Sequence, residues 1–338
     1  MEVKRIYRTL VLTTTVLAFV VVVVGAYVRL MDAGLGCPDW PGCYGALSPA
    51  HAQEEISKAV QAQGGEHGPV SLRKAWKEML HRYLAGTLGL LILAIAGVAW
   101  RSRRVPVGSS ALPTALLAVV VIQAALGMWT VTLLLKPAIV TLHLIGGMVT
   151  LSLLVWLSVR QLALRAPADA RAAQRLRRWA ALALAIVVGQ IALGGWVSSN
   201  YAALACVDFP TCHGVWVPVM DFRHGFQVVR ELGRTAAGTH LAYQALTAIH
   251  WAHRLGALVT LLFVGALAVV LMRVRGAALY GAILAILLAV QVSLGIANIL
   301  AGLPLAVAVA HNAVAALLLV ILVVINFALS RASSKSLP

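Results

Sequence analysis

Cysteine pairs and spaced histidines recur at corresponding places in the two halves of this 338-residue chain. The cysteines form two Cys-x5-Cys pairs, Cys37/Cys43 and Cys206/Cys212. The histidines that follow are His81 and His143 in the first half, and His253 and His311 in the second. Corresponding residues are 169 positions apart for the first cysteines, 172 for the first histidines and 168 for the second histidines. Spacing kept over so long an interval indicates a duplicated unit with its own two-histidine site.

Two imidazoles that face each other across a helical bundle suit the axial positions of a haem iron. Zinc is a weaker candidate, because its sites take three or four protein ligands and each half offers two histidines. The alternative is that the four histidines are separate structural residues, which their matched spacing in the two halves disfavours. Small residues beside the histidines would let a flat porphyrin approach the helix backbone, although they also suit helix packing. These residues are Gly146, Gly147, Gly256 and Ala315.

Arg82 and Arg254 each directly follow the first histidine of a half. A guanidinium is a forked donor that matches the carboxylates of haem propionates, so both arginines are candidate propionate contacts. An arginine at this place can equally anchor a helix at the lipid headgroups. Both readings predict that the arginines lie at the edge of the membrane.

Glu78 lies three residues before His81 and shares its helix face if the helix extends outward by one turn. The corresponding residue of the second half is His250. The first half thus holds a carboxylate suited to acid–base or cation-stabilising work, and the second half does not. The alternative for Glu78 is an ion pair with Lys74, Lys77 or Arg82.

The composition identifies an integral membrane protein. Mean hydropathy is +0.90, and 61% of residues are hydrophobic against 11% charged, whereas soluble domains are about a quarter charged. The first apolar run, 10–28, is too long for a signal peptide and no small-residue cleavage site follows it. Eight segments are long enough to cross a bilayer as helices: 9–30, 80–100, 112–134, 138–159, 179–197, 247–271, 278–301 and 304–328.

The charge distribution predicts the orientation. Segments on the N-terminal side of the membrane hold 16 cations and two acids, which leaves 11 cations and nine acids on the other side. By the positive-inside rule both termini are cytoplasmic, and the protein lies in the cell's inner membrane. The pI of about 10.6 reflects this rule, so we expect no nucleic acid as partner.

The predicted fold is all-α, with eight transmembrane helices arranged as two pseudo-symmetric four-helix bundles. Residues 1–160 form the N-terminal half, 161–178 a cytoplasmic linker, and 179–338 the C-terminal half. Two long loops, 31–79 and 198–246, lie outside. All four histidines are expected within the first two turns of helices that begin on the outer side, at one shallow depth. Both candidate haem sites therefore lie near the outer, periplasmic side.

The outer position of the cysteines predicts two disulfides, Cys37–Cys43 and Cys206–Cys212, because this compartment is oxidising. An exposed short-loop disulfide can be redox-active as well as structural, and the sequence leaves both roles open for Cys37 and Cys43. A four-cysteine zinc site across the halves is disfavoured. The remaining histidines are expected to face solvent: His51, His67, His213, His224 and His240.

These motifs together resemble the haem A synthase family over nearly the whole chain. The resemblance rests on Gly25-Ala-Tyr-Val-Arg-Leu, Cys37-Pro-Asp-Trp-Pro-Gly-Cys43, Glu78-x-x-His81-Arg82 and the four spaced histidines. It implies oxidation of the C8 methyl of haem O to a formyl group, which gives the haem A of cytochrome oxidase.

By the same resemblance, His81 and His143 ligate the iron of the substrate haem, and Glu78 is the catalytic carboxylate. His253 and His311 ligate the iron of a haem b cofactor. Haem O would be delivered by a haem O synthase. An electron donor or acceptor is also required, for which a quinone is one candidate, and a homo-oligomer is compatible with the pattern.

Two other functions fit a duplicated membrane protein with two histidine pairs. One is a cytochrome b-like electron carrier, which has no need for an acid beside a single iron. The other is a haem-binding assembly factor or transporter, in which polar residues would continue through the membrane. The inner two-thirds of the predicted helices are almost wholly apolar, with Gln123, Gln190, Gln291 and Asn298 among the exceptions.

Overall fold

The computed structural model describes residues 2–65, 70–101, 110–162, 164 and 169–334. Within these ranges the chain is helical and forms no strand. Eight helices are long and apolar enough to cross a membrane, as the sequence predicted. They are α1 (Glu2–Leu30), α3 (Leu72–Arg101), α4 (Ala111–Thr132), α5 (Pro137–Gln161), α6 (Ala170–Ser199), α8 (Tyr243–Met272), α9 (Ala278–Leu300) and α10 (Leu305–Ser334).

Several helices begin earlier than their apolar segments. Helix α3 begins eight residues before the expected start and α8 four residues before it. Helix α6 begins at Ala170, inside the expected linker 161–178, where the Asp169 side chain caps it by accepting from Ala172 N at 3.0 Å. Hydropathy detects only the part of a helix that faces hydrocarbon, so the polar turns beyond it were read as loop.

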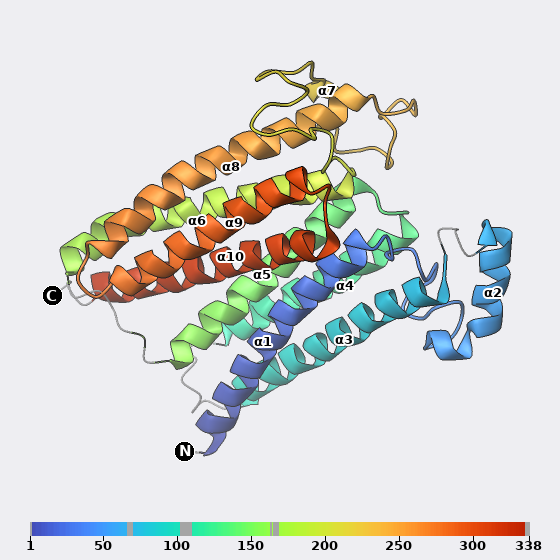
Figure 1. Ribbon diagram of the computed structural model, residues 1–338. Helices are drawn as coiled ribbons and strands as arrows, with labels where there is room; N and C mark the ends of the chain where they lie inside the picture. Colours follow the sequence, from blue (N-terminus) through green and yellow to red (C-terminus); the bar gives the residue numbers. More distant parts are fainter. Residues whose placement is uncertain (1, 66–69, 102–109, 163, 165–168, 335–338) are drawn as a thin grey trace.

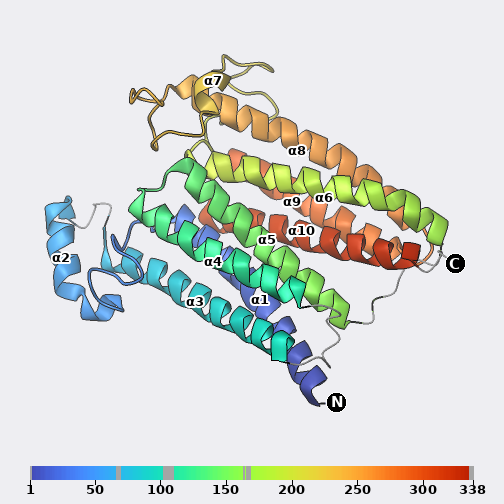
Figure 2. The same ribbon diagram turned by 180° about the vertical axis from the view of Figure 1, so that it is seen from behind.

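The helices pack in two sets of four (Figures 1 and 2). In the first set α1 contacts α3 and α5, and α4 contacts α3 and α5. In the second set α6 contacts α8 and α10, and α9 contacts α8 and α10. The two sets meet where α5 and α10 contact each other, α5 contacts α6, and α1 contacts α10. Buried Leu, Ile, Val and Ala side chains form one continuous core across both sets.

Polar contacts join the two sets at one end of the bundle. The Arg29 guanidinium donates to Ser198 O at 2.7 Å and lies 4.1 Å from the centre of the Tyr201 ring. Asp32 pairs with Arg29 at 3.2 Å and accepts from the Tyr201 hydroxyl at 2.8 Å. These contacts tie the end of α1 to the end of α6, 169 residues further along the chain.

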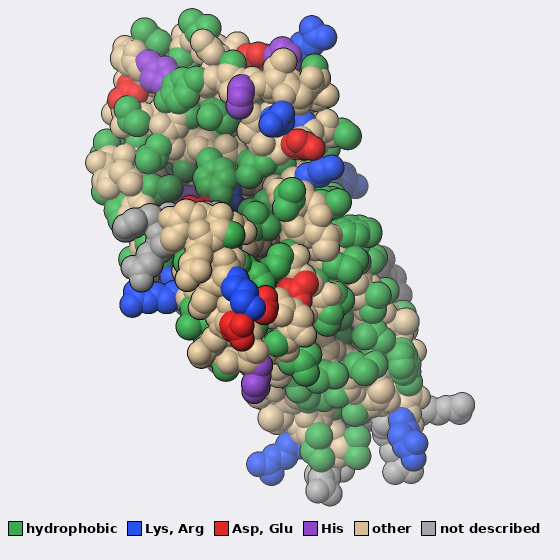
Figure 3. All heavy atoms as spheres, turned by 90° about the vertical axis from the view of Figure 1, so that its right-hand side faces the viewer, with side chains coloured by type: hydrophobic (Ala, Val, Ile, Leu, Met, Phe, Trp, Pro, Cys, Tyr) green, Lys and Arg blue, Asp and Glu red, His purple; other side chains and the backbone are tan. Residues whose placement is uncertain are grey.

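The long loops lie at this same end of the bundle, opposite the start of α1 and the end of α10 (Figure 1). The first loop contains a short 3-10 helix (Pro49–His51) and α2 (Gln53–Ala62), and the second contains α7 (Phe222–Gly225). Seen from the loop end, acidic and basic side chains and histidines gather on these loops (Figure 3).

Candidate functional site

The four bundle histidines come from α3, α5, α8 and α10 and form two pairs. His81 and His143 lie close enough to interact electrostatically, and so do His253 and His311. All four are half-buried. The expected position within the first two turns is right for His143 and His311. It is wrong for His81 and His253, because α3 and α8 extend further outward.

Each of these imidazoles lies against a glycine of a neighbouring helix in its own set. A Cβ added at Gly25 would lie 2.9 Å from His81 Cε1. An added Cβ would likewise lie 3.2 Å from the histidine Cε1 at three other glycines. Gly127 faces His143, Gly194 faces His253 and Gly295 faces His311. A side chain in any of these places would have to displace the imidazole.

Three of the four bundle histidines have a ring nitrogen without a hydrogen-bond partner in the described part of the chain. This nitrogen is Nδ1 of His81, His143 and His311, and it is buried. A buried polar atom without a partner is costly, so it needs an explanation. Two imidazoles per half, seated on glycines and incompletely hydrogen-bonded, fit axial ligation of a haem iron.

The glycines expected beside a porphyrin serve another purpose. A Cβ at Gly146 would lie 2.6 Å from the Gln123 amide oxygen, and one at Gly256 would collide with the Gln190 amide. Gly147 faces the Gln123 amide nitrogen, with a Cβ distance of 3.4 Å. The expected approach of a porphyrin to the backbone is therefore wrong at Gly146 and Gly256, since glutamine amides fill that space.

Glu78 is buried where α3 meets the first disulfide loop. Its Oε2 accepts from Cys37 N at 2.8 Å, and its Oε1 accepts from Arg82 Nη2 at 2.5 Å. Of the three ion-pair partners considered, the structure selects Arg82. Arg82 Nη1 also donates to the carbonyl oxygens of Asp39 at 2.7 Å and Gly42 at 2.5 Å. Arg82 and Glu78 together fasten the loop to the helix beside His81.

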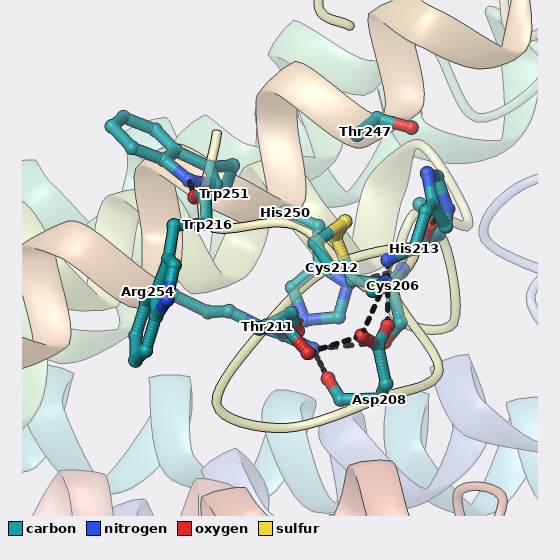
Figure 4. The surroundings of a disulfide bond; sticks show 12 residues. Cys206, Asp208, Thr211, Cys212, His213, Trp216, Thr247, His250, Trp251 and Arg254 are labelled. Carbon is teal, nitrogen blue, oxygen red and sulfur yellow. Dashed lines mark hydrogen bonds between the residues drawn. A yellow bond between two sulfur atoms is a disulfide. The ribbon is translucent and has the colours of Figure 1, made fainter. Parts of the chain in front are cut away.

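The second half repeats this corner with His250 in place of the carboxylate (Figure 4). Arg254 donates to the carbonyl oxygens of Thr211, Cys206 and Asp208 at 2.7 to 2.9 Å. Cys206 N lies 3.2 Å from His250 Nδ1, and Arg254 Nε lies 3.3 Å from His250 Nε2. Both arginines thus anchor loops, a role that the sequence reading missed because it depends on loop carbonyls.

Both expected disulfides are present, with S–S distances of 2.04 Å for Cys37–Cys43 and 2.03 Å for Cys206–Cys212. No cysteine of the described chain is free, so these sulfurs do not act as thiolate ligands of zinc. Of the remaining histidines, His51, His213 and His240 are exposed, and His224 is half-buried and pairs with Asp221. His67 lies outside the described residues.

An aspartate organises each disulfide loop. Asp208 accepts from Thr211 Oγ1 at 2.6 Å, His213 N at 2.7 Å and Gly214 N at 2.9 Å. These bonds, the Thr211 bond foremost, hold the pKa of Asp208 well below its usual range. Asp39 accepts the two equivalent backbone bonds, from Tyr44 and Gly45. Burial, and after it the nearby Asp39 and Glu78 carboxylates, raises the pKa of Tyr44.

The fold and the site define a multi-pass helical membrane protein with two histidine pairs beneath disulfide-closed loops. The chain belongs to the COX15-CtaA family of cytochrome oxidase assembly proteins, whose family model matches residues 8–323.

Curated relatives cover nearly the same length. The chain is 42% identical over 323 residues to the heme A synthase of Shewanella oneidensis, covering 96% of each chain. It is 33% identical to that of Rhizorhabdus wittichii, over 91% of this chain and 89% of the relative. It is 30% identical to that of Novosphingobium aromaticivorans, over 90% of both. The predicted family resemblance is confirmed.

Proposed function

We propose that this protein is a haem A synthase, which oxidises the C8 methyl group of haem O to a formyl group and so makes haem A for cytochrome oxidase. Support comes from relatives of that name at up to 42% identity over nearly the full chain. The family description, cytochrome oxidase assembly, is consistent with this product.

The proposal includes the topology. The N-terminal half, 1–160, and the C-terminal half, which includes α6 from Ala170 onward, form two pseudo-symmetric four-helix bundles in the inner membrane, with both termini cytoplasmic. The excess of cations on the side of the termini supports this orientation. The disulfides in the opposite loops support an oxidising compartment there. The haem sites then lie near the periplasmic side.

In the proposed reaction each half holds one haem. His81 and His143 ligate the substrate haem, and His253 and His311 ligate the resident haem b. When bound, haem b supplies one-electron transfer between the substrate site and an external redox partner, for which a quinone is our candidate. Haem O synthase is the proposed source of haem O.

Glu78 is the observation that leads us to place the oxidation reaction in the first half. It is 4% exposed, shares a helix face with His81 and has no acidic counterpart in the second half. A fixed carboxylate can hold a proton or stabilise positive charge that develops on the substrate. Arg82 and the backbone of Cys37 hold that carboxylate in place. A pure electron carrier would have no use for this difference between the halves.

Arg82 and Arg254 hydrogen-bond the loop carbonyls, and contact with haem propionates is a second role that we propose for them. A guanidinium has five N–H donors, and the loop carbonyls leave part of that capacity for a carboxylate at the edge of the site. Their primary effect on the reaction is to close the loops over the haem pockets.

The decisive experiment is co-expression of this protein with a haem O source, followed by haem extraction and mass spectrometry. The expected result is a new haem with the mass of the formyl product, in addition to haem b. Recovery of haem O and haem b alone, with the protein present in the membrane, would favour the electron carrier. A His81→Ala/His143→Ala double variant is the matched negative control.

A further inference from the structure

A motif of two residues recurs on the helices that pack against the four histidines, and one of its four copies differs from the others. The glycine that seats each imidazole is preceded, four residues earlier, by a glutamine in three of the four helices. The spacing of one turn places both on one helix face. The three complete copies are Gln123/Gly127 on α4, Gln190/Gly194 on α6 and Gln291/Gly295 on α9. The fourth copy, on α1, reads Val21/Gly25.

The glutamines contact the histidines that their glycines seat. Gln190 Nε2 lies 3.1 Å from His253 Nδ1 and 3.0 Å from His253 O. Gln291 Nε2 lies 3.2 Å from His311 Nε2. On α4, Gln123 Nε2 donates to the backbone carbonyl of His143 at 2.8 Å.

All three amide oxygens are buried and have no hydrogen-bond partner in the described chain. An amide presents an acceptor and two donors on one side chain. Gln190 and Gln291 place their amides against ring nitrogens, so either side chain, with its amide turned over, could accept the N–H of an imidazole whose other nitrogen is engaged by iron. Gln123 contacts only the backbone of His143. Such outer partners orient a ligating histidine and raise its basicity.

His81 lacks this support. Val21 stands where the glutamine would be and is buried. His81 Nδ1 has no partner in the described chain, as is also true of His143 and His311, but His81 alone has no glutamine beside it. Leu84 lies three positions after His81. The corresponding residue after His253 is Gly256, whose missing side chain leaves room for the Gln190 amide.

We propose that the Val21/Leu84 pair makes His81 a weakly held iron ligand, so that the first half exchanges its haem while the second half, with Gln190/Gly256, retains its haem. This inference rests on the proposed function, which requires one haem to enter and leave in each catalytic cycle and the other to stay. Loss of an outer partner of a metal ligand lowers metal affinity by about 10- to 100-fold. That range separates an exchangeable haem from a resident one.

The test exchanges the two environments in the full-length, haem-loaded protein. Val21→Gln/Leu84→Gly gives the first half the residues of the second, and Gln190→Val does the reverse. Haem release to excess apomyoglobin is followed in detergent, and mass spectrometry of the remaining haem distinguishes haem O and haem A from haem b. We expect the first variant to release haem O and haem A about 10-fold more slowly than wild type, and Gln190→Val to release haem b about 10-fold faster.

Val20→Gln is the matched control, because it adds the same amide one residue away on an exposed part of α1. It should leave both release rates unchanged. Unchanged release in both exchanged variants, or an equal effect of Val20→Gln, would overturn the inference. If the double variant does not assemble, Gln190→Val decides alone. A wild-type protein that binds no haem through His81 and His143 would instead contradict the proposed function.

Discussion

Each disulfide loop is anchored by an arginine at the corresponding position, Arg82 in the first half and Arg254 in the second. The residue four positions before that arginine differs between the halves: it is Glu78 in the first and His250 in the second. In the first half, one carboxylate accepts from both the loop backbone and Arg82, at 2.8 and 2.5 Å. In the second half, the ring nitrogens of His250 face the loop backbone and Arg254 at 3.2 and 3.3 Å. A neutral imidazole has one acceptor nitrogen, so it satisfies only one of these donors. Both arginines also donate to loop carbonyls, Arg82 to Asp39 and Gly42 among others and Arg254 to Thr211, Cys206 and Asp208.

This difference separates loop closure, which both halves achieve, from the carboxylate that only the first half has. The loop can be closed without a carboxylate, as the second half demonstrates. The buried Glu78 therefore exceeds what loop closure requires, and burial of a charge is expensive.

The largest effect is expected at the histidine pairs. His253→Ala or His311→Ala should abolish binding of haem b, because each removes one of the two residues that would hold its iron, and should leave the protein in the membrane. His81→Ala or His143→Ala should abolish binding of the substrate haem instead. Absorbance spectra and extracted haem of the purified variants give the measurement. Wild-type haem content in either pair of variants would refute that pair's assignment.

The next effect concerns the reaction itself. Glu78→Gln keeps the shape of the side chain and removes its charge, so we expect haem A formation to fall by about 100-fold or more while haem b is retained. The ratio of haem A to haem O in extracts measures it. His250→Gln is the control in the other half and should leave that ratio near the wild-type value. Equal rates for Glu78→Gln and wild type would reduce Glu78 to an ion-pair partner.

A third comparison concerns the arginines. Arg82→Ala leaves the buried Glu78 carboxylate unpaired, which typically costs about 3–5 kcal/mol. Both variants lose charged hydrogen bonds to loop carbonyls, each of which contributes about 1.5–3 kcal/mol, but Arg254→Ala leaves no buried charge without a partner. Thermal unfolding in detergent should therefore show the larger loss for Arg82→Ala. The order of the two variants would reverse if Glu78 were held mainly by the backbone.

The smallest effect is the acid sensitivity of the second loop. The hydrogen bonds to Asp208 lower its pKa in the folded state, so its contribution is present above the unfolded pKa of about 3.9 and is lost as pH falls through the folded value. Protease protection of 206–215 should persist at pH 4 and fall in stronger acid. Asp208→Asn should weaken protection already at neutral pH. Asp39→Asn should act less, because Gly42 replaces the Thr211 donor in the first loop.

The sequence predicted the features that depend on residue identity and register. Two cysteine pairs and two histidine pairs, kept in step across the halves, indicated the disulfides and the candidate sites before any coordinates. The apolar segments likewise identified all eight long helices. Such features are local or repeated, so they can be read from the chain alone.

Other features depend on which atoms meet in space. The polar turns that begin α3 carry Glu78 and were read as loop, because hydropathy does not distinguish a polar helix end from a connection. Arg82 and Arg254 bond to carbonyl oxygens, which every residue has and no motif marks. Gln190 was noted only as an exception to apolarity, and its link to His253 emerged from the packing of α6 against α8.

The bond from Arg29 to Ser198 also bears on how the protein is made. Its guanidinium is 15% exposed and rests on the carbonyl and the Tyr201 ring of a segment synthesised 169 residues later. At about 5–20 residues per second, the ribosome takes roughly 10–30 s to supply those partners. During this interval α3, α4 and α5 are synthesised, and the Arg29 guanidinium can pair with Asp32 but not yet with the Ser198 carbonyl. The completed α6 then supplies the Ser198 carbonyl to Arg29. Assembly of the first half is therefore complete only after synthesis of the second half has begun.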